Sequence, residues 1–238
     1  MLKRKLCHVL TMTMLCMMLA SCGGVRAPAA SAALQEEWQL EFNIPQRALA
    51  SSGEARYFVL NPGFQRVMET RGEKLTATVL DETREINGII TRVVEEREEK
   101  NGALAEVSRN YFAMDRDTGD VFLFGRDVQI VRGGQLMSDE DSWLAYSGGN
   151  RPGMFMPGAP VVGMKYYQEF VRGIAEDRAE VIRTSETVST PAGLFEDCLV
   201  IRVASDLEPG ATEEKAYAPG IGLAQEGSLL LVSYGYIR

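Results

Sequence analysis

The sequence predicts an all-β domain: a single antiparallel meander that forms a strongly curved sheet or a partly closed barrel, with little helix. Apolar and polar residues alternate with period two along many segments, as in strands with one face in the core. Two-residue turn sequences such as Asn87-Gly88 and Asn101-Gly102 separate these segments. Helical periodicity is weak throughout, and only residues 173–178 suggest one helical turn.

The first expected strand is residues 38–44, in which apolar and polar residues alternate until Pro45 ends the pattern. Apolar residues 57–60 then run into Asn61-Pro62-Gly63. This is a turn sequence, because proline presets φ and glycine accepts a positive φ. Residues 64–69 are expected to resume as a strand.

Long antiparallel strands are expected in the centre of the chain, because the turn sequences there are far apart. Their outward positions are charged and their inward positions are apolar or aromatic. This pattern predicts a sheet with one solvent-exposed face and one buried face. The expected strands are residues 75–86, 89–98, 104–114, 121–126, 128–132 and 135–137. The expected outward residues are Arg92, Glu96, Glu106 and Arg109, and the inward ones are Ile89, Val93, Val107 and Tyr111.

The C-terminal third returns to the strand pattern, interrupted by turns rich in proline and glycine. The expected strands are residues 165–173, 179–188, 198–205, 212–218, 221–226 and 229–237.

Residues 138–163 break the pattern, because their glycine and proline content is too high for a regular element. Long loops in compact domains are often functional, so this stretch is a candidate loop for a ligand or partner. The alternative is that its large side chains plug the end of the core. We expect Trp143 to be such a plug and residues 154–156 to form a partly exposed rim. The candidate residues are Trp143, Tyr146, Met154, Phe155 and Met156.

The N-terminus has the pattern of a secretory signal, with a basic start at residues 3–5 and an apolar run over residues 6–19. That run is shorter than the ~17–25 residues of a membrane-spanning helix. It ends in Leu19-Ala20-Ser21-Cys22, which resembles the bacterial lipoprotein signal. The resemblance implies cleavage before Cys22 and lipidation of that cysteine. Ordinary secretion, with cleavage near Ala30 or Ala33, is the alternative.

Three parts are therefore expected: a signal peptide at residues 1–21, a flexible tether at residues 22–33 and a single β domain at residues 34–238. The resemblance implies a lipid-anchored protein of the bacterial cell envelope, with the membrane as a partner through the anchor. No Asp follows Cys22. By resemblance to the sorting rule of enteric bacteria, this favours the outer membrane, facing the periplasm, over the inner membrane.

Charge and composition argue against several classes of function. Residues 1–21 carry three basic and no acidic residues, so their removal changes the net charge from -8 to -11. An acidic chain argues against binding to nucleic acid or to an anionic membrane surface. The lone histidine, His8, lies in the leader, so Ser-His-Asp and Cys-His catalysis and the usual zinc sites are not expected in the mature chain. No cofactor is expected. Cys198 precedes an apolar run and is expected to be a buried, inert thiol.

Acidic residues offer two further possibilities. Asp115, Asp117 and Asp120 resemble the start of a calcium loop. Gly119 and Arg126 stand where that loop expects ligands, so a hairpin turn is the favoured interpretation and cation binding stays open. Residues 95–99 hold four glutamates, which are expected at a solvated strand end. A pair of catalytic carboxylates on different strands would leave no spacing pattern in the sequence.

Five motifs follow one another along the chain: residues 57–63, the Asn87-Gly88 hairpin, residues 111–125, residues 190–198 and residues 217–223. Together they resemble a widespread group of exported bacterial β-rich proteins, over roughly residues 55–230. The resemblance implies the fold class and export, and it transfers no catalytic residue. The motif at residues 217–223 also resembles the closing strands of periplasmic lipoprotein-carrier sheets.

The functional expectation is a non-catalytic binding or assembly module of the envelope, which uses its curved sheet to hold an apolar ligand or a protein partner. The alternative is a carboxylate-dependent hydrolase that acts in the cell envelope.

Overall fold

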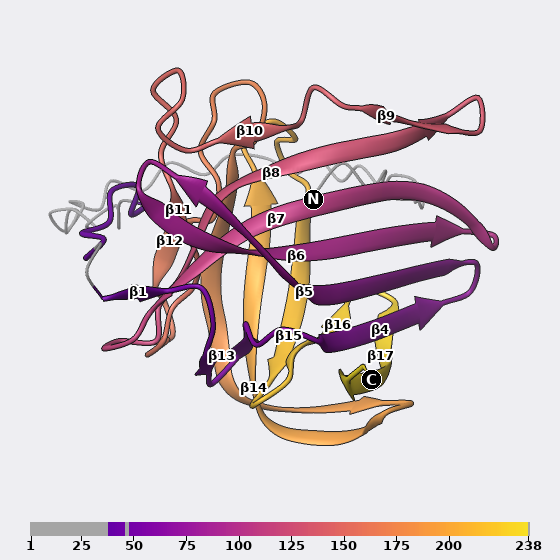
Figure 1. Cartoon of the computed structure of the whole chain (residues 1–238). Coiled ribbons are helices and arrows are strands. Elements are labelled where there is room, and N and C mark those ends of the chain that lie inside the picture. The colour runs from indigo at the N-terminus through magenta and orange to yellow at the C-terminus, as the bar shows by residue number, and fades with distance from the viewer. Residues whose placement is uncertain (1–37, 46–47, 238) are drawn as a thin grey trace, which may run out of the picture. The chain divides into compact units, whose positions relative to one another are not determined.

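A computed structural model describes residues 38–45 and 48–237 of the chain (Figure 1). This part contains strands and no helix, which confirms the all-β prediction. The predicted signal peptide at residues 1–21, the lipidation site Cys22 and the tether at residues 22–33 lie outside the described residues.

The strands in the first half of the chain are β1 (Leu49–Ala50), β2 (Glu54–Ala55), β3 (Phe58–Val59), β4 (Phe64–Thr70), β5 (Glu73–Ile86), β6 (Ile89–Lys100), β7 (Ala103–Asp115) and β8 (Val121–Arg132). The remaining strands are β9 (Gln135–Ser138), β10 (Trp143–Leu144), β11 (Gly153–Met156), β12 (Lys165–Tyr167), β13 (Asp177–Thr190), β14 (Gly193–Ser205), β15 (Thr212–Ala218), β16 (Gly222–Glu226) and β17 (Leu229–Tyr236).

One large antiparallel sheet contains nearly all of these strands, in the order β10-β8-β7-β6-β5-β4-β17-β16-β15-β14-β13-β12. β1 pairs with β7, whereas β9 and β11 pair with β8. The last strand, β17, pairs with β4. This pairing joins the first half of the meander, β4 to β8, to the second half, β12 to β17. Among the described residues, the path ends at β10 on one edge and at β12 on the other, so these strands form an open sheet and not a closed barrel.

The sheet bends back on itself. In Figure 1, strands β13, β14 and β15 run nearly upright behind strands β5 to β8, which lie more horizontally. The space between the two halves is the core. Its most deeply buried large side chains are Tyr57, Leu60, Met68, Leu123, Phe124, Met156, Tyr166, Leu199, Ile201, Leu229 and Leu231.

The predicted tight hairpins are confirmed by their backbone angles. Asn87 and Gly88 have φ of 50° and 80°, and Asn101 and Gly102 have φ of 52° and 77°. Positive φ at both central residues is the type I′ conformation, whose twist matches that of the flanking strands. Gly133-Gly134, with φ of 60° and 81°, joins β8 to β9 in the same way.

Residues 38–44 were expected to form a strand, and this expectation is wrong. Only Gln39 forms a bridge, with Tyr166 of β12. The alternation of apolar residues is real, because Leu40, Phe42 and Ile44 are half-buried and their neighbours are exposed. Alternation of apolar and polar residues indicates that one face of a segment is buried. It does not require the backbone of that segment to pair with another strand.

Residues 138–163 are more regular than expected, because β10 and β11 lie within them and pair with β8. Gly125 of β8 allows β10 to approach. A Cβ at this glycine, whose φ is 143°, would lie 2.4 Å from the Trp143 carbonyl oxygen. A further difference lies at residues 165–173, where the strand ends at Tyr167. No helical turn forms at residues 173–178; Val171 and Ala175 form a bridge around a turn there.

Both faces of the central strands are buried in places. Arg92 is buried and Glu96 is half-buried with Oε2 inaccessible, so the prediction of one solvent-exposed face is wrong at these two residues. Arg92 is 8% exposed, and its Nε donates to the Ser51 carbonyl at 2.8 Å. The predicted inward residues Ile89, Val93, Val107 and Tyr111 are buried as expected. A register shift between Val79 and Thr83 bends the β5–β6 hairpin. Arg84 of this hairpin covers Tyr111, with its guanidinium 4.6 Å from the ring centroid.

Candidate ligand cleft

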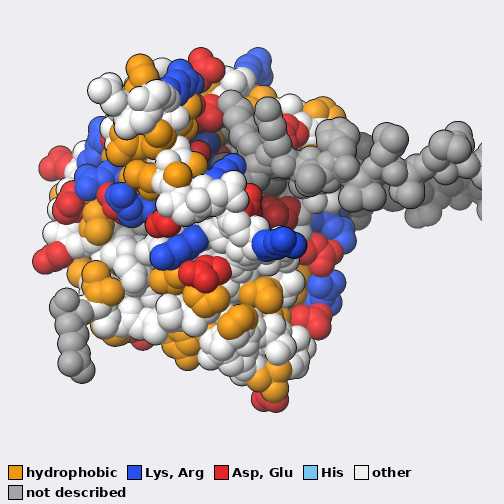
Figure 2. All heavy atoms as spheres, turned by 90° about the vertical axis from the view of Figure 1, so that its right-hand side faces the viewer, with side chains coloured by type: hydrophobic (Ala, Val, Ile, Leu, Met, Phe, Trp, Pro, Cys, Tyr) orange, Lys and Arg blue, Asp and Glu red, His pale blue; other side chains and the backbone are white. Residues whose placement is uncertain are grey.

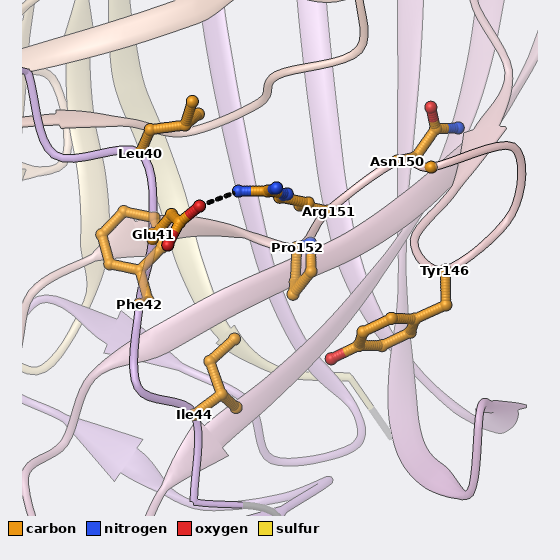
Figure 3. A pocket seen from close by; sticks show the side chains of 9 residues that line it. Leu40, Glu41, Phe42, Ile44, Tyr146, Asn150, Arg151 and Pro152 are labelled. Carbon is orange, nitrogen blue, oxygen red and sulfur yellow. Dashed lines mark hydrogen bonds and ion pairs between the residues drawn. The ribbon is translucent and has the colours of Figure 1, made fainter.

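A cleft of about 620 Å³ lies between residues 38–45, here called the strap, and residues 146–152, here called the cleft loop (Figure 3). This volume lies within the ~300–1,000 Å³ of small-molecule sites. The lining residues are Leu40, Glu41, Phe42, Ile44, Tyr146, Gly149, Asn150, Arg151 and Pro152.

The strap is fixed to the sheet by its backbone at one residue. The Gln39 amide donates to the Lys165 carbonyl at 3.0 Å, and the Tyr167 amide donates to the Gln39 carbonyl at 2.9 Å. Within the described chain, no backbone–backbone hydrogen bond holds residues 40–44. Residues 40–44 therefore form one wall of the cleft without being paired to a neighbouring β-strand.

Side-chain packing holds the strap in place instead. The Trp38 ring lies 4.8 Å from the Arg178 guanidinium carbon, a cation–π distance. Further along, the Phe42 ring packs near Phe122 of β8, with centroids 6.1 Å apart. The apolar side chains of the strap thus form one wall of the cleft and also attach that wall to the domain.

The cleft loop is a tight structure built on positive φ angles. Tyr146, Gly148 and Gly149 have φ of 63°, 61° and 88°. The Tyr146 amide donates to the Asn150 carbonyl at 2.9 Å, and the Asn150 amide donates to the Ser147 carbonyl at 3.0 Å. These bonds close the loop on itself. Just before the loop, the Ala145 amide donates to the Phe124 carbonyl of β8 at 2.8 Å and joins this segment to the sheet.

Tyr146 is the unusual residue of this loop. A bulky side chain at positive φ is strained, and such strain tends to occur at functional sites. Its ring points from the cleft loop toward the strap (Figure 3), and the residue as a whole is 44% exposed. Partial burial raises the pKa of its hydroxyl above the ordinary value, so the phenol is neutral at physiological pH.

An ion pair crosses the cleft: Arg151 of the cleft loop contacts Glu41 of the strap (Figure 3). The arginine side chain is 53% exposed and the glutamate side chain 77% exposed. Exposed ion pairs contribute little to stability, because water and salt screen them. The pair therefore links the two walls only weakly.

Of the five residues predicted for a ligand loop, the structure places Tyr146 alone in the lining of the cleft. Trp143 is a buried plug, 4% exposed, and its Nε1 donates to Glu169 Oε2 at 2.9 Å. The other oxygen of this carboxylate lies 3.0 Å from Nη1 of Arg126. This buried carboxylate therefore joins β8 and β10 to the segment that follows β12.

The expectation of a partly exposed rim at residues 154–156 is wrong for Met154 and Met156. Met154 is 9% exposed and Met156 is fully buried, because β11 pairs with β8 and carries them into the core. Phe155 is half-buried, and its ring packs against Phe58 and Phe112 with centroids 5.5 and 4.9 Å apart.

Sequence reasoning missed the strap and Arg151 as parts of a site. The alternation at residues 38–44 signals a covered face but reads equally well as an ordinary strand. Arg151 lies in a glycine-rich turn whose local sequence indicates only a loop. Nothing in the sequence brings the two segments together.

A second group of charged residues lies inside the core. The Lys215 ammonium and the Glu226 carboxylate are 2.9 Å apart, with side chains 7% and 5% exposed. Arg66 of β4 is buried and donates from Nη1 to the Ile221 carbonyl at 3.3 Å. These residues come from both halves of the sheet.

Glu96 is the unsatisfied member of this group. Its buried Oε2 has no hydrogen-bond partner in the described chain. Burial raises its pKa from the ordinary 4.5 to about 7; the nearby Glu226 adds to the increase and Arg66 opposes it. Glu96 and Glu226 are two buried carboxylates that affect each other's charge, but neither lines the cleft.

The aspartates that resemble a calcium loop form a hydrogen-bonded hairpin turn. One oxygen of Asp115 accepts from the Asp117 amide at 2.8 Å. Asp120 accepts from the Gly158 amide at 2.8 Å and from the Thr118 hydroxyl at 2.8 Å. Across residues 38–45 and 48–237, no three His, Cys, Asp or Glu residues are grouped so as to hold a metal ion. Cys198 is free and buried, and burial raises the pKa of its thiol.

No family model, curated protein or solved structure matches this chain. The described residues include no helix with the length and apolar character needed to cross a bilayer. Acidic and basic side chains are intermingled on the face shown in Figure 2, so no field of one sign dominates there. The feature of the molecule that indicates a function is therefore the cleft, through its geometry and its lining residues.

Proposed function

We propose that the chain is a non-catalytic binding module of the bacterial cell envelope, anchored by lipid on Cys22, and that its cleft holds the apolar part of a ligand or partner. The location rests on the lipoprotein-like residues 19–22. The binding role rests on the cleft, whose volume of about 620 Å³ and mixed apolar and charged lining suit a small amphipathic ligand.

Three properties of the cleft support this role. Its apolar residues come from two segments far apart in the sequence, the strap and the cleft loop. One wall, residues 40–44, carries no backbone ladder and can move without breaking the sheet. The facing wall is fixed by the hydrogen bonds of the cleft loop and presents a strained tyrosine. A rigid wall facing an adaptable one accommodates ligands of varied length.

Native mass spectrometry of the mature protein from bacterial membranes tests the proposal. We expect the wild-type protein to retain an apolar mass, and Ile44→Asp in the cleft wall to lose it. Leu136→Asp is the matched control, because Leu136 is an exposed apolar residue of β9 outside the cleft lining. A wild-type protein without bound mass, or equal retention by both variants, would contradict the proposal.

A further inference from the structure

Arg151 and Glu41 are the only charged residues that line the cleft in the described chain. The arginine comes from the fixed cleft loop, and the glutamate comes from the strap, which is held by side-chain packing. A carboxylate thus already occupies the one cationic position of the cleft, and it is supplied by the more easily displaced wall.

Resting on the proposed function, we propose that the ligand is a single-chain amphiphile with a carboxylate headgroup, such as a fatty acid. Its headgroup replaces the Glu41 carboxylate at the Arg151 guanidinium. Its chain lies along the apolar residues of the cleft.

The chemistry of arginine supports this exchange. A guanidinium presents its donors in a planar fork that matches a carboxylate, and the resulting charge-assisted hydrogen bonds are stronger than neutral ones. The existing partner is weakly held, because Glu41 is 77% exposed and loses little when it returns to water. A ligand carboxylate gains the same bonds and adds the burial of its chain.

The apolar walls fit a single extended chain. Leu40, Phe42 and Ile44 recur at alternate positions of the strap, and Pro152 and the Tyr146 ring line the opposite side. Burial of each methylene group favours binding through the hydrophobic effect. Because residues 40–44 lack ladder hydrogen bonds, the strap can shift outward to admit the chain when Glu41 releases Arg151.

The test uses the full-length protein in isolated bacterial envelopes, where no metabolism can attach the probe to Cys22. Three photoreactive C16 probes are compared: a fatty acid, the matching alcohol and the matching alkyl phosphate. Peptide mapping then shows whether the label lies on the strap and the cleft loop. We expect the acid to label these peptides about tenfold more than the alcohol, from the charge-assisted bonds to Arg151.

Variants separate the headgroup from the cleft. Arg151→Gln should reduce acid labelling about tenfold and leave alcohol labelling unchanged, whereas Arg151→Lys should give an intermediate value. Glu41→Gln should increase acid labelling, because it removes the competing carboxylate. Arg132→Gln is the control, since Arg132 is an exposed arginine in an ion pair with Asp139 outside the cleft lining.

The outcomes distinguish the two proposals. Equal labelling by acid and alcohol that ignores Arg151→Gln overturns the headgroup inference and leaves the binding role intact. Preference for the phosphate overturns the choice of a carboxylate. Absence of label from the strap and cleft loop with every probe overturns both the inference and the proposed function.

Discussion

Glu96 illustrates how a single buried group sets a pH dependence. Its pKa is about 7 instead of 4.5 because burial disfavours the charged carboxylate. The folded state therefore binds the proton more tightly than the unfolded state does. The stabilisation from this proton is fully present below pH 4.5, and it is lost as the pH rises to about 7.

We expect Glu96→Gln to remove this slope and to be more stable than the wild-type protein at pH 8, by up to about 3 kcal/mol. Urea unfolding at pH 5 and pH 8 measures the effect. Glu95→Gln is the control, because Glu95 belongs to the same strand and pairs with Arg109 at 3.1 Å. A wild-type stability that does not fall between these pH values would show that Glu96 titrates normally.

Tyr146 is expected to show a conflict between stability and binding. Asparagine tolerates positive φ better than tyrosine, so Tyr146→Asn should relieve strain of about 1 kcal/mol. The same change removes an apolar surface from the cleft. We predict an unchanged or higher melting temperature together with weaker ligand retention. A clear loss of stability would mean that the ring contributes more by packing near Phe124 than its backbone costs.

The hairpins are the elements that the sequence predicted best, because their turns depend on local chemistry. At Gly88 a Cβ would meet no atom within 4 Å, so any cost of substitution there comes from the backbone. Gly88→Val should destabilise the domain by ~1–3 kcal/mol, since φ is 80°. Thermal melting beside Gly88→Asn, which tolerates this conformation, checks the reason; equal melting of the two variants would refute it.

Elements that depend on their neighbours were predicted less well. The strap has the alternation of a strand, but only Gln39 pairs with the sheet, and Pro45 limits any extension. Residues 138–163 have the composition of a loop, but the accessible edge of β8 pairs with β10 and β11. Propensity describes a segment alone, and tertiary contacts decide whether its backbone is paired.

For the whole molecule, alternation and turns predicted an antiparallel meander but not which distant strands meet. The pairing of β17 with β4 and the burial of Arg92 and of Glu96 Oε2 depend on contacts between residues far apart in sequence. The cleft has the same origin, because the strap and cleft loop lie about a hundred residues apart and meet through the ion pair of Glu41 with Arg151.

The anchor remains a prediction from residues 19–22, which lie outside the described part of the chain. Cys22→Ser should stop lipid labelling and leave unprocessed precursor, because the lipid is expected on this sulfur. Membrane fractionation with radiolabelled palmitate measures both effects. A mature protein that begins after Ala30 or Ala33 and fractionates as a soluble protein would instead indicate ordinary secretion.

The most direct measurement of ligand binding in the cleft is hydrogen–deuterium exchange of the mature protein in nanodiscs, with and without dodecanoate or dodecanol. Amides of residues 40–44 lack backbone partners in the described structure and should exchange rapidly without ligand. We predict that an added amphiphile slows exchange in the strap and in residues 146–152, while the β5–β8 ladder is unchanged. Protection confined to other strands, or no change in the strap, would contradict the account.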